Sequence, residues 1–378
     1  MSNDQSSFKE AQEWDPKIRK FVQQEQEQEY RRLALALGLG SDPVKAYEHI
    51  SQRPMPVALQ DRYLSLGLPT IYEDPYFYPA MTITFDLLQK ELTERGKPFT
   101  PRPFLATLPS GDVNARIVEE PKTGTPIMFF NHGLFRLLYD FAKLTAWATP
   151  PLSIKQLSND SALMNLARKY TIPFQASEFF AASLYAYVVS GSPIAISLPI
   201  PEPIHNLPIS IALLNHMERF IVAHELAHIH EHHLDESPTW QQEYEADALS
   251  LGLISTLAHE DFGSWAIGYW ACELALIAFN FLYRAIGLLA FGPEKLEWIS
   301  KTHPDPLSRR EHLRGIWLEQ NVPEIGLAAA RELCGMTEAL FQRLWEISFP
   351  LLVISYQQGT RPSPMWNKEI QYSFTVQN

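Results

Sequence analysis

Two histidines four residues apart, His224 and His228, enclose a glutamate, Glu225, in the stretch His-Glu-Leu-Ala-His. On a helix, positions i and i+4 share one face, so both imidazoles can reach a single point in space. Two neutral imidazoles suit Zn²⁺, and an adjacent carboxylate can take a proton from a metal-activated water. Glu225 lies about 100° round the helix from His224, close to that point but off the ligand face. The stretch therefore predicts two ligands and a base of a zinc site.

A pair of acidic residues follows at the same spacing, in the stretch Glu-Tyr-Glu-Ala-Asp at residues 243–247. Glu243 and Asp247 are again i and i+4, so both side chains lie on one face of a second helix. One carboxylate can bind the metal, while the other orients a ligand histidine through its second ring nitrogen. Together the two stretches predict an open, catalytic zinc site with two histidines and one acidic residue as ligands.

Further histidines surround this motif, and a five-residue match of its kind also occurs by chance. His232 continues the i+4 face of His224 and His228, so a shifted metal site is an alternative. Only the first pair encloses a glutamate directly after its first histidine. Apolar neighbours on both sides predict a buried helix, which we place at Ile209 to His233. We interpret the extra histidines as surface or structural residues: His216, His230, His232 and His233.

A third stretch, Thr302 to Arg310, contains two prolines that predict a rigid turn leading into a helix. Its His303 can be protonated and its Arg309 is always charged, so either could stabilise an oxyanion or bind a substrate carboxylate. The alternative is a surface helix cap held by salt bridges. The residue types alone leave both interpretations open.

These three stretches, in this order, resemble the gluzincin metallopeptidases, in particular the CAAX-type and HtpX-type zinc endopeptidases. That group has His-Glu-x-x-His, then Glu-aromatic-x-Ala-Asp, then a His-Pro element with an arginine six residues after the histidine. The resemblance implies that His224, His228 and Glu243 bind one zinc ion per chain. It also implies that Glu225 is the general base of a peptidase.

The same resemblance assigns roles to the remaining motif residues. Asp247 would support a ligand histidine, His303 would act in catalysis, and Arg309 would lie near the substrate. The match covers only the region from about His224 to Leu313. Its 14 residues between His228 and the next ligand are fewer than is typical of the membrane-bound members. This short connection is typical of a compact, soluble gluzincin.

The composition indicates a globular protein with a large core. Of the 378 residues, 46% are hydrophobic and 12% aromatic. A net charge of −12 argues against a nucleic-acid binder. The protein or peptide substrate that we expect is what the resemblance to metallopeptidases implies. The two cysteines, Cys272 and Cys334, form no metal or disulfide pattern, which fits a reducing compartment. Residues 1–13 lack an apolar signal core, so we expect a cytoplasmic protein.

A long apolar stretch, Phe262 to Gly292, is close to the length that spans a bilayer. Glu273, Asn280 and Arg284 interrupt it, and no uncharged run within it reaches about 18 residues. A helix that is apolar all round is otherwise the core helix of a larger protein. We therefore predict a buried core helix, with membrane contact as the less favoured alternative.

We predict a predominantly helical α+β protein with a zincin-like metallopeptidase core, a small β-sheet and helical additions. Asp15 and Pro16 predict the start of a first helix that runs towards Leu37. The predicted parts are an N-terminal helical region at 1–96, the metallopeptidase core at 97–320, and a C-terminal helix with a polar tail at 321–378.

Short strands complete the prediction. They are placed at Phe104–Leu108, Val113–Val118 and Ile127–Phe130, with a further terminal strand at Phe349–Tyr356. An edge strand just before a zinc helix can hold an extended peptide across the metal by backbone hydrogen bonds. The alternative is a hairpin that serves only the fold.

The predicted function is zinc-dependent hydrolysis of peptide bonds. Zinc would lower the pKa of its water towards about 7, and Glu225 would accept the proton and later deliver it to the leaving amine. His303, or a tyrosine such as Tyr244, would offset charge on the tetrahedral intermediate. Two alternatives remain, a regulatory or sensor protein with a structural zinc and a membrane-associated protease. Glu225 argues against the first, because a structural site needs no base.

Overall fold

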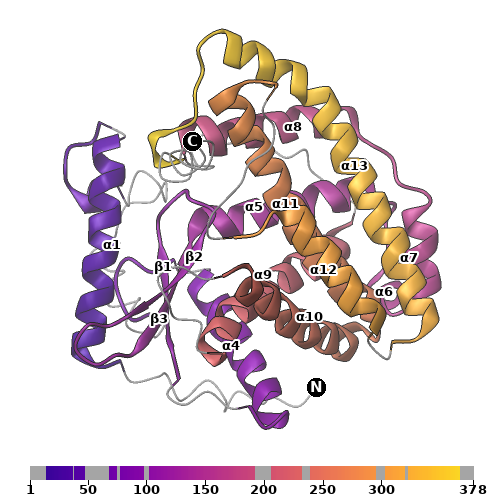
Figure 1. The fold of residues 1–378 in the computed structure, drawn as a ribbon, viewed down its shortest axis with the longest axis horizontal. Helices are drawn as coiled ribbons and strands as arrows, with labels where there is room; N and C mark the ends of the chain where they lie inside the picture. The colour runs from indigo at the N-terminus through magenta and orange to yellow at the C-terminus, as the bar shows by residue number, and fades with distance from the viewer. Residues whose placement is uncertain are drawn as a thin grey trace.

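The computed structural model describes residues 14–36, 38–46, 68–74, 77–97, 102–191, 206–231, 239–294, 303–319 and 322–366. Within these ranges the chain is predominantly helical with one small sheet at its side, which confirms the α+β, mostly helical class (Figure 1). The long helices are α1 (Pro16–Ala36), α4 (Phe77–Glu94), α5 (His132–Ala148), α9 (Leu207–His230), α10 (Trp240–Phe262), α11 (Trp265–Phe291), α12 (Pro306–Glu319) and α13 (Glu324–Gln357). Shorter helices are α6 (Ile154–Leu157), α7 (Asp160–Ala167), α8 (Phe174–Tyr185), the π-helical turn η2 (Ala186–Ser190) and the 3₁₀ turn η4 (Pro364–Trp366).

The three predicted strands form one sheet in the order β1-β3-β2, which consists of β1 (Phe104–Leu108), β2 (Ala115–Glu119) and β3 (Pro126–Asn131). β2 and β3 form an antiparallel hairpin, and β1 adds to β3 in parallel. β1 and β3 are buried along their whole length, whereas β2 is half-exposed. β1 and β2 are the two edge strands of this sheet among the described residues, and β2 is the more exposed of them.

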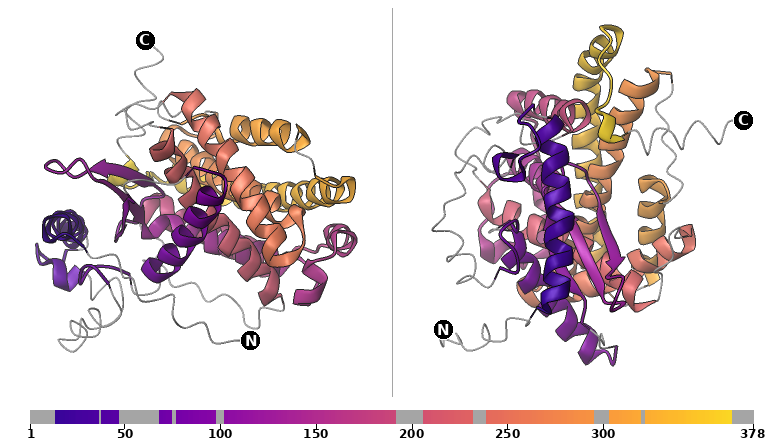
Figure 2. Two further views of the ribbon diagram at one scale, coloured as in Figure 1. Left: turned by 90° about the horizontal axis from the view of Figure 1, so that it is seen from below. Right: turned by 90° about the vertical axis from the view of Figure 1, so that its left-hand side faces the viewer.

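Alternate residues of β1 and β3 point to opposite faces of the sheet, and each face has its own cover. α1 lies along the outer face, in front of the strands in the right-hand view of Figure 2. The inner face packs on the main helical core. The outer cluster consists of Trp14, Ile18, Val22, Phe104, Ala106, Leu108, Ile127 and Phe129.

A buried carboxylate ties α1 to the sheet. Glu73 accepts hydrogen bonds from the Thr107 amide (2.8 Å), the Thr107 hydroxyl (2.6 Å) and the Gln26 side-chain amide (2.8 Å). Burial raises the pKa of Glu73 to about 8, although these hydrogen bonds act in the opposite direction. The sheet and its outer helix are thus joined by one titratable group.

The apolar stretch forms α11, which packs against α9, α10, α12 and α13 (Figure 1). By length and composition it is the one helix in the described ranges that could cross a membrane, yet 72% of its most apolar window is buried. Its charges have partners from other segments. Glu273 binds Arg310 and Arg314, while Arg284 lies 4.6 Å over the Trp345 ring and donates to Gln342. α11 is a core helix of this structure.

The predicted terminal strand at Phe349–Tyr356 is wrong, because α13 runs unbroken through this segment to Gln357. β-branched residues favoured a strand, but Ser348 and Leu352 continue the buried face of the helix. Pro350 lies inside the helix on its exposed side. Packing of the whole helix face against α11 overrides the local preference. His232, His233, Thr302 and the residues after Trp366 lie outside the described ranges.

Candidate metal centre

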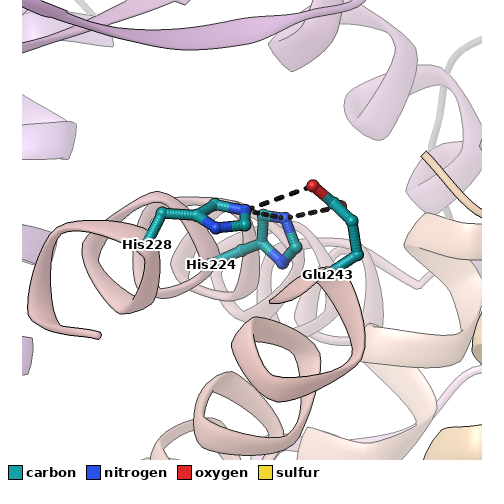
Figure 3. Close-up of side chains that lie close together, drawn as sticks. All are labelled: His224, His228 and Glu243. Atoms are coloured by element: carbon teal, nitrogen blue, oxygen red, sulfur yellow. Dashed lines mark hydrogen bonds and ion pairs between the residues drawn. The ribbon is translucent and has the colours of Figure 1, made fainter. Parts of the chain in front are cut away.

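α9 and α10 pack side by side and bring together three potential metal ligands (Figure 3). The Nε2 atoms of His224 and His228 are 3.1 Å apart. His224 Nε2 lies 3.3 Å from Glu243 Oε2, and His228 Nε2 lies 3.4 Å from Glu243 Oε1. All three side chains are buried. The two histidines predicted to share a helix face therefore do so, and Glu243 joins them from the next helix.

The dimensions of this cluster fit a zinc ion. Tetrahedral zinc with bonds of about 2.0–2.2 Å to nitrogen and oxygen separates its ligands by roughly 3.3–3.5 Å. The two Nε2 atoms are 3.1 Å apart, each lies 3.3 or 3.4 Å from a different oxygen of Glu243, and one ligand atom from each of the three residues lies within 4.8 Å of the others. Both carboxylate oxygens of Glu243 are buried, and neither makes a hydrogen bond within the described part of the chain. Two imidazole nitrogens and one carboxylate oxygen are a donor set that zinc accepts, and the cluster contains no fourth ligand among the described residues.

The local sequence explains why each helix presents these groups. α9 is buried nearly all round in its second half, so its position is set by core packing. α10 begins with a capping box, in which the Thr239 hydroxyl accepts from the Gln242 amide and the Gln242 side chain accepts from the Thr239 amide. This cap places Glu243 in the first helical turn, where a carboxylate is stabilised by the helix dipole.

Asp247 lies on the far side of His224 from Glu243. Its Oδ1 is 3.0 Å from His224 Nδ1, and the side chain is fully buried. Burial would raise the pKa of Asp247, but the charge and hydrogen bonds of Arg309 hold it below its usual value. Burial likewise would lower the pKa of His224, but the neighbouring carboxylates of Asp247 and Glu243 raise it to about 9. Glu243 thus faces the Nε2 atoms, and Asp247 faces the opposite ring nitrogen.

Glu225 borders a pocket beside this cluster. Burial raises the pKa of its carboxyl group, as a general base requires. The pocket is lined by residues from β2 and the loop before it, from α5, α9 and α11, and from the third motif. They are Val113, Asn114, Ala115, Leu134, Ile221, His224, Glu225, Phe279, Tyr283, His303, Pro304, Pro306 and Arg309. The first and third stretches of the sequence motif therefore meet at one pocket, and the second stretch contributes Glu243 to the metal cluster beside it.

Two of the candidate site residues, His303 and Arg309, come from the third motif and line this pocket. His303 Nε2 lies 3.8 Å from Glu243 Oε1, and burial lowers the pKa of His303 to about 4, so its ring is neutral near pH 7. Arg309 borders the pocket but is 7% exposed, and its guanidinium binds Asp247. Arg309 is therefore held by a salt bridge, as the second interpretation expects, but the salt bridge is buried and not at the surface. Contact of Arg309 with substrate stays a prediction.

Two contributors to the pocket were not foreseen. Tyr283 and Phe279 are i and i+4 on α11, and both reach the pocket from the apolar stretch. Tyr244, the tyrosine considered first, instead packs against the His312 ring at 4.6 Å and does not line the pocket. In the sequence, Tyr283 differs from its apolar neighbours only in its hydroxyl group, which in a buried tyrosine usually finds a hydrogen-bond partner.

Of the two additional histidines of α9, His216 has a structural role. His216 is fully buried, shares a hydrogen bond of 2.8 Å with the Ala212 carbonyl, and packs on Phe262. Burial lowers the pKa of His216 to about 4, so the ring is neutral. His230 is half-buried beside Glu231 and lies outside the metal cluster.

Comparisons of the chain with protein-family models, curated proteins and solved structures found no match. Assignment to the gluzincins therefore rests on the three motif stretches and stays a prediction.

Proposed function

We propose that this chain is a zinc-dependent metallopeptidase of the gluzincin kind, which hydrolyses peptide bonds in a protein or peptide substrate. One observation carries the proposal: His224, His228 and Glu243 form a buried three-ligand cluster, and Glu225 borders the pocket beside it. Bound zinc would supply Lewis-acid activation of water and of the peptide carbonyl. This combination of an open metal position and an adjacent base supports a catalytic role for the metal over a structural one.

The surrounding side chains have separate roles in the proposed reaction. Glu225, with its raised pKa, accepts a proton from water and returns it to the leaving amine. Asp247 holds His224 in its tautomer and orientation, and Arg309 holds Asp247. His303 and Tyr283 border the pocket and can donate hydrogen bonds to the developing oxyanion.

The edge of the sheet supplies a place for an extended substrate. Ala115, the first residue of β2, and Asn114 before it line the pocket that contains Glu225. β2 pairs with β3 on one side, so its other edge is available for backbone hydrogen bonds within the described structure. This arrangement favours the substrate-holding interpretation of the hairpin over a purely structural one.

The two alternatives have less support. A regulatory protein with a structural zinc would be expected to have four protein ligands, and the cluster offers three in the described ranges. A membrane-associated protease would use α11, but most of that helix is buried against other helices.

Both cysteines are buried without a disulfide, so we propose a reducing compartment such as the cytoplasm.

The test compares new protein N-termini in cells that carry the wild-type chain or Glu225→Gln. The substitution removes the base but no metal ligand, so zinc content and fold should be retained while cleavage products disappear. Glu245→Gln, an exposed position on α10, is the matched control and should leave the product set unchanged. Identical N-termini in wild-type and Glu225→Gln cells would refute the peptidase assignment.

A further inference from the structure

α12 begins within the third motif and contains Arg309, but it buries few apolar residues. Its buried side chains are Pro306, Arg309, Arg310, Leu313 and Trp317, so two of the five are arginines. Long-range polar contacts must therefore contribute strongly to its position. Two residues of this helix, Pro306 and Arg309, line the pocket beside the metal cluster.

The two arginines are consecutive and lead to different helices. Adjacent residues on a helix point about 100° apart. Arg309 binds Asp247 on α10 through two hydrogen bonds of 2.7 and 2.6 Å. Arg310 binds Glu273 on α11, with Nη2 at 3.0 Å from Oε2. α12 is thus attached to both neighbouring helices by buried Arg–carboxylate pairs.

Glu273 is the acceptor at the centre of the contact between α12 and α11. Arg314, one helical turn after Arg310, donates to Glu273 at 2.6 and 2.9 Å, and the Tyr269 hydroxyl donates at 2.7 Å. The Glu273 side chain is fully buried, whereas Glu338, which binds the same two arginines from α13, is half-exposed. A bidentate pair fixes both distance and rotation, so Glu273 constrains how far and at what angle α12 lies.

We infer that Glu273 is a positioning residue for the metal centre, acting through α12. It does not line the pocket with Glu225 and is not part of the metal cluster. By holding Arg310 and Arg314, it sets the rotation at which the neighbouring Arg309 meets Asp247, and Asp247 in turn orients His224. It also sets where the His303–Pro304 turn, which leads into α12, meets the pocket. This inference rests on the proposed function.

The experiment measures metal binding and ligand geometry. Zinc affinity of purified wild type and Glu273→Gln is determined by chelator competition, and Co²⁺ replaces zinc so that its visible spectrum reports on the ligands. We expect Glu273→Gln to bind zinc about 10-fold more weakly, at the lower end of the usual effect of losing support behind a ligand. We also expect an altered cobalt spectrum and faster hydrogen exchange of α12 amides.

Two control variants separate positioning from general destabilisation. Glu338→Gln removes the half-exposed acceptor of the same arginines, and should leave zinc affinity and the cobalt spectrum near wild type. Leu340→Ala truncates a fully buried core residue of α13 and lowers the melting temperature without touching α12 ion pairs. If Leu340→Ala weakens zinc binding as much as Glu273→Gln does, the effect is general and the inference is wrong.

Further outcomes are equally decisive. If Glu273→Gln binds zinc and cobalt as wild type does, Glu273 only stabilises the fold. If Glu273→Gln does not fold, the same measurements are made on Arg314→Gln, because Arg314 is partly exposed. We expect Arg314→Gln to weaken zinc binding by a smaller factor than Glu273→Gln would. In that case, wild-type zinc affinity and a wild-type cobalt spectrum in Arg314→Gln overturn the inference. Absence of zinc binding in wild type would refute the proposed function first, and the positioning role with it.

Discussion

Arg309 binds Asp247 through a two-point contact, with Nε 2.7 Å from Oδ2 and Nη2 2.6 Å from Oδ1. The same Oδ1 atom lies 3.0 Å from His224 Nδ1, so one buried carboxylate connects an arginine of α12 to a proposed zinc ligand of α9. Charge-assisted, bidentate pairs of this kind are strong and geometrically specific. The first and third motifs are therefore coupled through Asp247.

Removal of this carboxylate should weaken metal binding. Asp247→Ala is expected to lower zinc affinity by roughly 10–100-fold, because His224 loses its orienting partner. It should also lower the unfolding free energy by up to about 3 kcal/mol, because the buried Arg309 loses its two-point partner and keeps only the 3.8 Å ion pair with Glu243. Zinc titration and urea unfolding measure the two effects. Glu245→Ala, an exposed change on the same helix, should alter neither. The reverse pattern would require a different register for α10.

The purified chain should contain about one zinc ion. The His224→Ala, His228→Ala double variant should lose it, because both imidazole ligands are gone. Metal analysis after gel filtration measures the content. His230→Ala, a histidine of the same helix outside the cluster, should retain zinc. Equal zinc content in the double variant and the wild type would show that the metal binds elsewhere.

Stability should depend on pH through Glu73. The folded pKa of about 8 lies above the ordinary value of 4.5, so folding takes up a proton between these pH values. The stability contributed by Glu73 is therefore fully present below about pH 4.5 and is lost as pH rises to about 8. Relative to Glu73→Gln, the wild type should lose up to about 1.4 kcal/mol per pH unit in this window. Urea unfolding between pH 5 and 8 measures the difference.

The matched control for this pH effect is Glu119→Gln, at an exposed position of β2. Its stability should follow the wild-type curve at every pH. A constant difference between wild type and Glu73→Gln across the window would mean that Glu73 stays ionised in the folded protein.

The chain should appear in the soluble fraction after lysis without detergent. A charge at the middle of a bilayer costs roughly 2.5–3.5 kcal/mol on insertion scales, and a spanning α11 would carry both Glu273 and Arg284. In the structure Glu273 has two arginine partners instead. Fractionation followed by carbonate extraction tests this. Recovery only from carbonate-resistant membranes would contradict the buried-helix assignment.

Spacing along the chain was sufficient to predict the centre of the candidate site. The 3.6-residue period of a helix places His224 and His228 on one face wherever that helix packs, and the same holds for Glu243 and Asp247. The mostly helical class, the small sheet and the burial of α11 followed from composition and apolar patterning. These features depend on residues close in sequence, so a single sequence contains them.

The remaining features depended on the tertiary structure. The sequence showed that Arg309 is charged, but not that it would bind Asp247, and it did not distinguish Tyr283 from Tyr244 at the pocket. It also suggested a strand where α13 continues as a helix. In each case the outcome depends on which faces of distant elements pack together, because burial and long-range ion pairs override local preference. Backbone geometry determines spacing within an element, whereas only the packed fold determines the partners between elements.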